Sequence, residues 1–352
     1  MKKGNVFTRA LTLTLAGSML LTGCGASADE ASAQLFAMDT VMQLDAYGHQ
    51  VKQAVSDAEE TIQALEARLS RTREDSLVSV LNQNGAAQDL SAAEQALLSE
   101  ALTFRDATGG AFDITIAPVM DAWGFTGDSY RVPAQDELDA LLENVNSDEI
   151  RLSGNSVTLG AGQAIDLGGI AKGYTSDCVE AVFRENKIES GKISLGGNVF
   201  VLGGKPDGAD WRVGIRDPQD ENALAAVLTL RDAYAITSGG YERYFTENGN
   251  TYHHIIDPST GYPADSGLLS VTVVAEANGP DFSGPGNGTM CDAFSTALFV
   301  MGEERALEFW QTGGYDFDLV LVTADGRVII TDGLSDRFEV VKDSGYTYET
   351  VS

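Results

Sequence analysis

The chain has 352 residues, of which 43% are hydrophobic, and its 52 acidic against 23 basic residues give a formal net charge of −29. This length and apolar content exclude a wholly disordered chain and allow one large domain or two smaller ones. The acidity excludes the positive field with which nucleic-acid-binding proteins neutralise phosphates, and it opposes binding to anionic lipid head groups. After the N-terminal segment, no stretch reaches the roughly 18 apolar residues that a membrane span needs.

The N-terminus has the pattern of an export signal. A basic start precedes an apolar run over 10–21 that is too short to span a membrane. The run ends in Leu21–Cys24, which resembles the bacterial lipobox, where the chain is cleaved before the cysteine and the cysteine is lipidated. We therefore expect a signal peptide over 1–23, a palmitate-bearing anchor at Cys24 and a polar tether over 24–34. The mature protein would then sit on the extracytoplasmic face of a bacterial membrane. An ordinary signal peptide with an incidental cysteine is the alternative.

Hydrophobic periodicity predicts helices in the next part of the chain. Apolar residues at three- and four-residue steps predict a helix over 51–69. Ser91 and Glu94 form a capping-box pattern that opens a second helix, which Gly109-Gly110 ends. A third helix is expected after Pro133.

The middle of the chain is predicted to consist mostly of strands. The segments 149–152 and 156–159 flank a turn and indicate a hairpin. A strand over 163–167 is expected to lead into a helix over 170–187. Further strands are expected over 192–202, 211–215, 225–230, 252–256 and 270–274.

The last third is predicted to contain two helices, over 291–301 and 303–310, and a hairpin around 324–326. Because strands and helices alternate without a regular βαβ repeat, the pattern favours a mixed α+β fold with mostly antiparallel sheets and packed helices. No low-complexity linker divides it, so we expect a single domain over 35–345. The two remaining cysteines, Cys178 and Cys291, are expected to be free buried thiols.

The first segment with a chemical pattern is 164–174, Ala-Ile-Asp-Leu-Gly-Gly-Ile-Ala-Lys-Gly-Tyr. A strand leading into a glycine pair that opens a helix would present free N–H groups and the positive end of the helix dipole to an anion such as a pyrophosphate. A glycine-rich turn with a surface lysine is an equally good interpretation of this segment alone.

Asp292 and Thr296 form the second segment. They lie four residues apart, on one face of the predicted helix. Oxygen ligands that converge in this way suit Mg²⁺. On spacing alone a structural role is favoured, in which Asp292 supports the first helical turn and Thr296 bonds back to its own helix.

The third and fourth segments carry histidines and a carboxylate. His253 and His254 are adjacent on a predicted strand, so their side chains should point to opposite faces and only one should enter a given pocket. That one could act as a general base, or it could be a structural histidine. In 111–118, a phenylalanine and Asp113 precede an apolar run. Alone, this run is best interpreted as a core strand with a capping aspartate.

Taken together, these segments resemble the ApbE family of FAD:protein FMN transferases, over roughly residues 35–340. The resemblance is carried jointly by the following stretches, in chain order: Met38–Thr40, 111–118, 164–174, Ser194–Asn198, Thr237–Tyr241, 252–263 and 291–300. It implies an exported, often lipid-anchored, Mg²⁺-dependent flavin transferase with a T-fold-related structure. Asp39 departs from the glycine that is common in the family's Met-Gly-Thr motif, and the segment 279–290 looks longer than usual.

The resemblance also implies a reaction and a set of site residues. FAD would be the substrate, a threonine hydroxyl of an acceptor protein would attack the FMN phosphorus, and AMP would leave. Mg²⁺ would be held by the Gly169 backbone carbonyl, Asp292 and Thr296, and His254 would be the base or would orient the hydroxyl. The residues implied to contact FAD are Met38, Thr72, Ala111, Phe112, Asp113, Asp166, Lys172, Ile255 and Ser295. A hydrolase that cleaves FAD to FMN and AMP, or a non-catalytic flavin-binding lipoprotein, are the alternatives.

Overall fold

The computed structural model describes residues 29–127, 129–280 and 282–352. The predicted signal peptide and Cys24 lie outside the described residues. Among the helices that are described, none combines the length and the apolar character needed to cross a bilayer.

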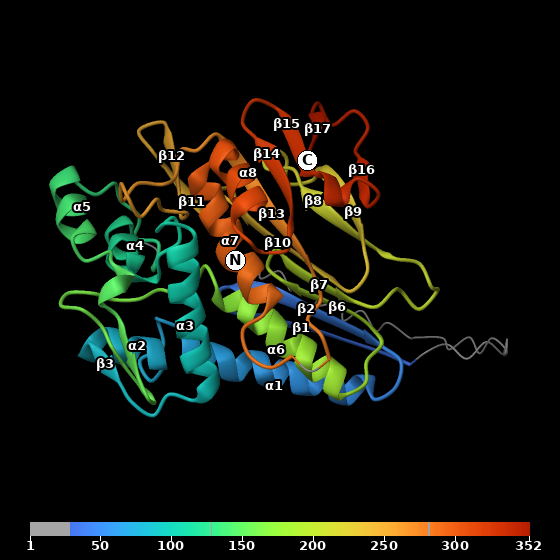
Figure 1. The fold of residues 1–352 in the computed structure, drawn as a ribbon, viewed down its shortest axis with the longest axis horizontal. Coiled ribbons are helices and arrows are strands. Elements are labelled where there is room, and N and C mark those ends of the chain that lie inside the picture. The colour runs from blue at the N-terminus through green and yellow to red at the C-terminus, as the bar shows by residue number, and fades with distance from the viewer. Residues whose placement is uncertain (1–28, 128, 281) are drawn as a thin grey trace, which may run out of the picture.

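A large sheet forms the centre of the molecule (Figure 1). Over the described residues it has nine strands, in the order β1-β2-β6-β7-β10-β13-β14-β15-β17. Neighbouring strands pair antiparallel, except β15 and β17, which run parallel. The predicted α+β fold with mostly antiparallel strands is therefore confirmed. The strands are β1 (Glu30–Ala37), β2 (Thr40–Tyr47), β6 (Ser190–Leu195), β7 (Asn198–Leu202), β10 (Ala233–Gly239), β13 (Leu268–Glu276), β14 (Asp318–Thr323), β15 (Arg327–Thr331) and β17 (Thr347–Val351).

Helices cover one face of this sheet. The helix α7 (Asn287–Met301) packs against β10 and β13, and α6 (Ala171–Glu185) packs against α7 and α1 (Val51–Leu69). Eleven of the fifteen residues of α7 are buried, among them the polar Asp292 and Ser295. The other helices are α2 (Leu77–Asn84), α3 (Ala92–Ala107), α4 (Ala117–Trp123), α5 (Gln135–Leu142) and α8 (Glu303–Thr312), with short 3₁₀ turns at Ile114–Ile116, Ser147–Glu149 and Asp332–Leu334.

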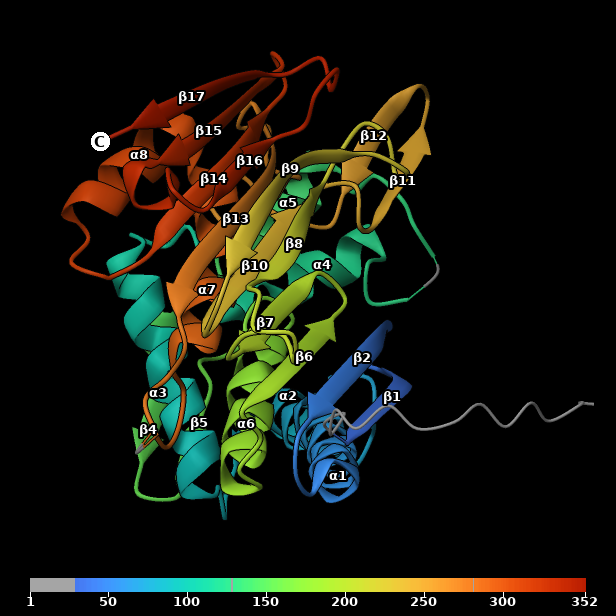
Figure 2. The same ribbon diagram turned by 90° about the vertical axis from the view of Figure 1, so that its right-hand side faces the viewer.

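Smaller sheets complete the fold (Figure 2). The strands β8 (Trp211–Arg216), β9 (Leu224–Leu230) and β16 (Phe338–Val340) form a sheet whose apolar residues share a core with the other face of the central sheet. The remaining strands are β3 (Ala86–Ala87), β4 (Arg151–Ser153), β5 (Ser156–Thr158), β11 (Tyr244–Glu247) and β12 (Asn250–His253).

A separate aromatic cluster fixes the turn that follows β12. Trp123 and Phe125 pack there with Ile256 and with aromatic residues of β11 and β12. The indole N–H of Trp123 donates a hydrogen bond of 2.7 Å to the carbonyl oxygen of Gly261. The segment after His253 is therefore held by a packed core, although it has no regular secondary structure.

Several predicted elements are confirmed, among them the capping box, in which Ser91 and Glu94 bond each other's backbone N–H groups. Two predicted strands are wrong, and a third consists of two strands. Residues 163–167 form no strand, and 192–202 is divided by a turn at Gly196-Gly197, both of which have positive φ. The run after Asp113 is a 3₁₀ turn followed by α4, because proline is favourable in the first turn of a helix.

Two domain boundaries also differ from the prediction. The tether expected over 24–34 is strand β1 from Glu30 onward, because Ala31, Ala33 and Leu35 alternate toward the helical core. The domain continues past 345, since β17 adds to the sheet beside β15. Cys178 and Cys291 are free, as predicted, although Cys178 is only partly buried.

Candidate active site

The contact between α6 and α7 brings together the two halves of the predicted metal site. The backbone N–H of Gly173 donates a hydrogen bond of 2.7 Å to Oδ2 of Asp292. A Cβ placed on Gly173 would lie 2.5 Å from Cβ of Asp292, so only glycine allows the helices to approach this closely. Asp292 is 3% exposed, and within the described residues this is the only hydrogen bond of its carboxylate, so Oδ1 is free for another partner.

The glycine turn before α6 lies against α7 here. A Cβ placed on Gly169 would lie 3.4 Å from Oγ1 of Thr296 and 3.2 Å from the ring of Phe112. The Thr296 hydroxyl, the Asp292 carboxylate one turn earlier on α7 and the Gly169 carbonyl would together supply oxygen ligands only, which suits a hard cation such as Mg²⁺. No group of three or more His, Cys, Asp or Glu side chains able to hold a metal occurs in the described part of the chain. A site here would thus depend on the hydroxyl and a backbone carbonyl.

A serine on β10 orients this part of α7. The Ser238 hydroxyl lies 2.8 Å from Oγ of Ser295 and 3.2 Å from Oγ1 of Thr296. Ser295 also donates to the backbone carbonyl of Asp292 at 2.9 Å. Ser295, an expected FAD contact, therefore serves first to hold the helix. Ser238 was not among the predicted site residues, although it lies in one of the stretches that carry the family resemblance.

A second, fully buried carboxylate locks the start of α7 to α6. Asp177 accepts hydrogen bonds from the backbone N–H groups of Gly286, Gly288 and Thr289, at 2.8, 2.8 and 2.9 Å. It also accepts from the amide of Asn278 at 2.8 Å. The three backbone N–H groups lie at the start of α7, where a helix has no partners of its own for its N–H groups. The cap fixes the axial position of α7, and with it the position of Asp292.

The anion cradle predicted at the start of α6 is only partly available. The N–H of Gly168 bonds to Asp166 at 2.7 Å, and the N–H groups of Ile170 and Ala171 bond to the carbonyl of Leu167. The N–H of Gly173 is taken by Asp292, as described above. The prediction of several free N–H groups is thus wrong, because the preceding loop already supplies acceptors. In this segment the N–H groups of Gly169 and Lys172 have no partner among the described residues.

The Lys172 side chain is the best candidate to bind a phosphate here. It lies in the first turn of α6, is partly buried and makes no ion pair among the described residues. Its positive charge also contributes to the lowered pKa of His254.

Asp166 belongs to an ion-pair network that crosses the loops beside α6. Its carboxylate bonds to Arg71 at 2.9 Å, and Arg71 also bonds to Asp121 at 2.8 Å and to Thr126 at 2.9 Å. Thr72 contacts only Ser70 within this loop. The residue that joins this loop to the site is therefore Arg71, next to the threonine that the resemblance indicated.

The segment 111–113 lies against the glycine turn through Phe112, while Ala111 and Phe112 are both buried. The Asp113 carboxylate points into the protein, where it accepts from the hydroxyl and N–H of Thr115, at 2.6 and 2.8 Å, and from Ser147. Its side chain is therefore occupied by local structure. Any contact of Asp113 with a ligand would come from its backbone.

The two adjacent histidines have different surroundings. The ring of His253 is engaged at both nitrogens: Nε2 lies 3.1 Å from the carbonyl oxygen of Ala264, and Nδ1 accepts from the N–H of Ile255 at 3.3 Å. The ring of His254 uses only Nδ1, which lies 3.2 Å from the carbonyl oxygen of Arg243. A carbonyl can only accept, so Nδ1 of His254 carries the proton and Nε2 keeps its lone pair.

Burial of the His254 ring, together with the positive charge of Lys172, lowers its pKa from 6.5 to about 3. The ring is therefore neutral at physiological pH, the state in which it can accept a proton. Burial also lowers the pKa of His253. The free Nε2 of His254, compared with a His253 ring that is engaged at both nitrogens, supports His254 as the group that meets an incoming hydroxyl.

The turn between β1 and β2 forms a rim of this site. The sulfur of Met38 lies 3.7 Å from the Thr175 hydroxyl, on the second turn of α6. Asp39 pairs with Arg243 at 3.4 Å. Both Met38 and Asp39 have positive φ, as a two-residue hairpin turn requires.

Ile255, another residue implied to contact FAD, directly follows His254 and is buried.

One further polar group was not expected. The side-chain amide of Asn198 is buried and has no hydrogen-bond partner in the described residues. Asn198 pairs with Ile236 across the sheet, on the face that carries Ser238 two residues later. Like Ser238, it lies in a glycine-containing motif whose role the sequence did not specify.

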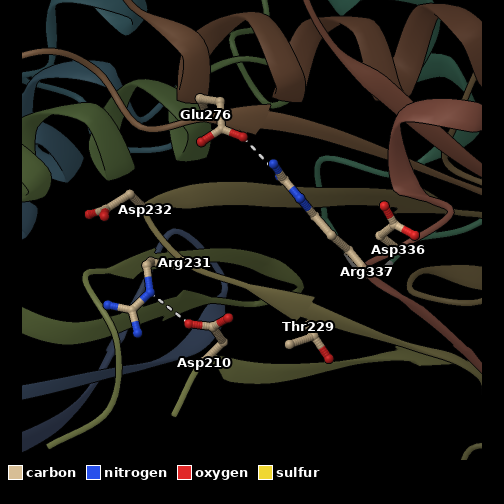
Figure 3. A pocket seen from close by; sticks show the side chains of 7 residues that line it. All are labelled: Asp210, Thr229, Arg231, Asp232, Glu276, Asp336 and Arg337. Carbon is tan, nitrogen blue, oxygen red and sulfur yellow. Dashed lines mark hydrogen bonds and ion pairs between the residues drawn. The ribbon is translucent and has the colours of Figure 1, made fainter. Parts of the chain in front are cut away.

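A surface pocket away from these residues offers no competing site (Figure 3). Its arginines are paired, Arg231 with Asp210 at 2.6 Å and Arg337 with Glu276 at 2.8 Å. None of the candidate residues lines it. The lining residues are Asp210, Thr229, Arg231, Asp232, Glu276, Asp336 and Arg337.

Comparisons with known proteins agree with this geometry. The ApbE family model matches residues 38–319. The chain is 33% identical to an FAD:protein FMN transferase of Treponema pallidum over 83% of each chain, and 28% identical to one of Vibrio cholerae over 89% of this chain and 94% of that protein. The crystal structure of the ApbE protein from Thermotoga maritima superposes with a TM-score of 0.76 at 29% identity, covering 89% of this chain and 97% of that one.

The family match extends from the β1–β2 turn to β14, and so includes α6, α7 and the histidine turn that build the site. The chain belongs to the ApbE family.

Proposed function

We propose that this protein is an FAD:protein FMN transferase, which moves FMN from FAD to a threonine hydroxyl of an acceptor protein and releases AMP. The observation that carries the proposal is the junction of α6 and α7. There the Asp292 carboxylate and the Thr296 hydroxyl of α7 lie against the glycine turn that leads into α6. The first turn of α6 carries Lys172, which makes no ion pair among the described residues. Its relatives, from Treponema pallidum to Escherichia coli, are named for this activity.

The chain's own residues would each perform a definite task. Lys172 would bind a phosphate of the FAD diphosphate, since its ammonium has no other partner among the described residues. His254, neutral and fixed by the carbonyl of Arg243, would accept the hydroxyl proton at Nε2. The hydroxyl oxygen would then form a bond to the FMN phosphorus, and the bond from that phosphorus to the AMP phosphate oxygen would break.

We further propose that the site binds Mg²⁺ through Asp292, Thr296 and the Gly169 carbonyl. When bound, the ion would neutralise negative charge on the diphosphate, which is the main requirement of phosphoryl transfer. The oxygen-only donor set supports this assignment, as does the free Oδ1 of Asp292. Ser238 would keep the Thr296 hydroxyl aimed at the same point.

The location of the enzyme is also part of the proposal. The lipobox-like Leu21–Cys24 supports a palmitate-bearing anchor at Cys24 on the outer face of a bacterial membrane. The acceptor would then be an extracytoplasmic protein with an exposed threonine.

The transfer reaction can be tested with the mature protein, FAD, Mg²⁺ and candidate acceptors. Fluorescence that stays with the acceptor on a denaturing gel would support transfer, whereas free FMN and AMP without labelled protein would identify a hydrolase. FAD that binds but stays intact would identify a non-catalytic binding protein.

The metal assignment has a matched pair of variants. Asp292→Asn removes a charge at almost unchanged volume and should reduce transfer by orders of magnitude, while Thr296→Val, whose lost ligand a water can replace, should be milder. EDTA should abolish the activity of the wild type. Full activity of Asp292→Asn, or an unchanged rate in EDTA, would contradict a metal at this site.

A further inference from the structure

The strand β1 ends the central sheet, and its outer edge pairs with no other strand in the described part of the chain. It pairs with β2 over eight consecutive residues, from Glu30↔Tyr47 to Ala37↔Thr40, without a bulge. In a hairpin with a two-residue turn, the pair next to the turn shares both hydrogen bonds, and bonded and non-bonded pairs then alternate. Ala37 and every second residue before it therefore bond to β2. The hydrogen bond of 2.9 Å from the N–H of Gly48 to the carbonyl of Asp29 fits this alternation.

This alternation leaves a row of backbone groups free. The N–H and C=O groups of Ser32, Gln34 and Phe36 point away from β2, toward solvent. Proteins usually protect such an edge with lysine, proline, a bulge or a covering segment. At these three positions β1 has no lysine or proline, and its register is regular. The edge is therefore open to an added strand.

An apolar pair lies at the end of this edge. Phe36 is 71% exposed and Val41, its partner across the hairpin, is 54% exposed. The other residues of β1 on that face are polar. In peptide recognition by strand addition, the backbone gives affinity and contacts with alternate side chains give selectivity, a role that this apolar pair can fill.

The edge leads directly to the active site. Beyond Phe36 the chain turns at Met38, whose sulfur contacts Thr175, two residues after the Gly173 that bonds to Asp292. Asp39, in the same turn, pairs with the arginine whose carbonyl fixes His254. Figure 2 shows the β1–β2 and β11–β12 hairpins on the same side of the molecule. A strand added to β1 would thus have one end at the β1–β2 turn, which borders the site.

We propose that the acceptor protein docks by adding an extended segment, the one that carries the accepting hydroxyl, to the outer edge of β1, with an apolar side chain on Phe36 and Val41. This inference rests on the proposed function, because a transferase that modifies proteins must bring an acceptor segment to its diphosphate site. Phe36 and Val41 would fix the register that places the hydroxyl.

Gln34→Pro tests the edge, with Gln34→Ala as its matched control. The Gln34 N–H points outward, so proline removes no bond to β2 but blocks an added strand. The probe is the purified acceptor that the transfer assay labels. We expect Gln34→Pro to lower kcat/KM for the acceptor by about tenfold or more while the affinity for FAD is unchanged, and Gln34→Ala to behave as wild type. Phe36→Ser should raise the KM for the acceptor in the same direction.

Hydrogen exchange on the wild type provides a readout that needs no variant of the enzyme. An acceptor with its threonine replaced by valine should bind without reacting and should slow exchange at the amides of Gln34 and Phe36. Unchanged exchange there, or acceptor kinetics of Gln34→Pro equal to wild type, would overturn the proposal. The proposal would also be overturned if the wild type were a dimer that Gln34→Pro dissociates while transfer stays unchanged. The edge of β1 would then pair with a second copy of the chain and not with the acceptor. Absence of any labelled acceptor would refute the transfer activity itself, and this inference with it.

Discussion

The neutral state of His254 makes the stability of the protein depend on pH in a defined direction. Burial lowers the pKa of this ring from 6.5 to about 3, so the folded protein holds it neutral, whereas the unfolded chain takes up a proton once the pH falls below about 6.5. The contribution of the buried neutral ring is therefore fully present above the unfolded value and is lost progressively as the pH falls toward the folded value.

The size of this effect follows from the slope of about 1.4 kcal/mol per pH unit for one proton. Between about pH 6.5 and pH 5, the ring of His254 should cost the wild type ~2 kcal/mol of unfolding free energy. Other groups titrate over this range, so the relevant quantity is the difference between wild type and His254→Gln. Glutamine cannot be protonated there, yet its amide can still donate to the carbonyl of Arg243.

Urea unfolding of both proteins at about pH 7.5 and about pH 5 gives that difference. We expect the wild type to lose ~2 kcal/mol more than His254→Gln on acidification. The NMR signal of the ring should also show no titration between about pH 5 and pH 8. A difference that does not change with pH, or a ring that titrates near its ordinary value, would refute the assignment of His254 as a neutral base.

Four further outcomes can be checked separately. His254→Ala should slow FMN transfer by about 10²–10⁴-fold and His253→Ala far less, measured by acceptor labelling; equal losses in two folded variants would contradict the assignment. Asp177→Ala should lower the unfolding free energy by about 1–3 kcal/mol or more in urea titrations, because it leaves buried N–H groups at the start of α7 unpaired. Gly173→Ala should lower both stability and transfer, since its Cβ would stand 2.2 Å from a carbonyl oxygen of α7; a wild-type melting curve would argue against this contact. Cys24→Ser should move the protein out of the membrane fraction, and persistent detergent-requiring association would count against lipidation.

The sequence predicted the elements whose own pattern determines them. The helix α1 follows from its apolar spacing, and α3 follows from a capping box that forms as predicted. Prediction failed where distant contacts decide the conformation. The segment 163–167 has the composition of a strand, but Asn82 bonds both the N–H and the carbonyl of Ile165, which leaves no partner strand. The small residues at the start of β1 form a strand because they pair with β2 and pack against α1, two contacts that their own sequence does not reveal.

The site shows the same division. The positions of Asp292, Thr296 and the glycine pair follow from motifs, but spacing within one helix could not reveal that Gly173 of another helix bonds to the carboxylate. Arg71 and Ser238 were missed for the same reason, since their partners lie on other elements. The prediction of free N–H groups at the start of α6 was wrong because Leu167 and Asp166 already accept hydrogen bonds from most of them.

The hydrogen bond between Gly173 and Asp292 joins residues 119 positions apart, and the cap of α7 by Asp177 joins residues as distant. Neither half of the site can therefore acquire its geometry until α6 and α7 have both left the ribosome and packed together. A chain that crosses a membrane before it folds would carry no functional site on the side where it is made. If the chain is exported before it folds, its capacity to modify other proteins would arise only in the compartment where folding is completed, because the two halves of the site lie 119 residues apart in the chain.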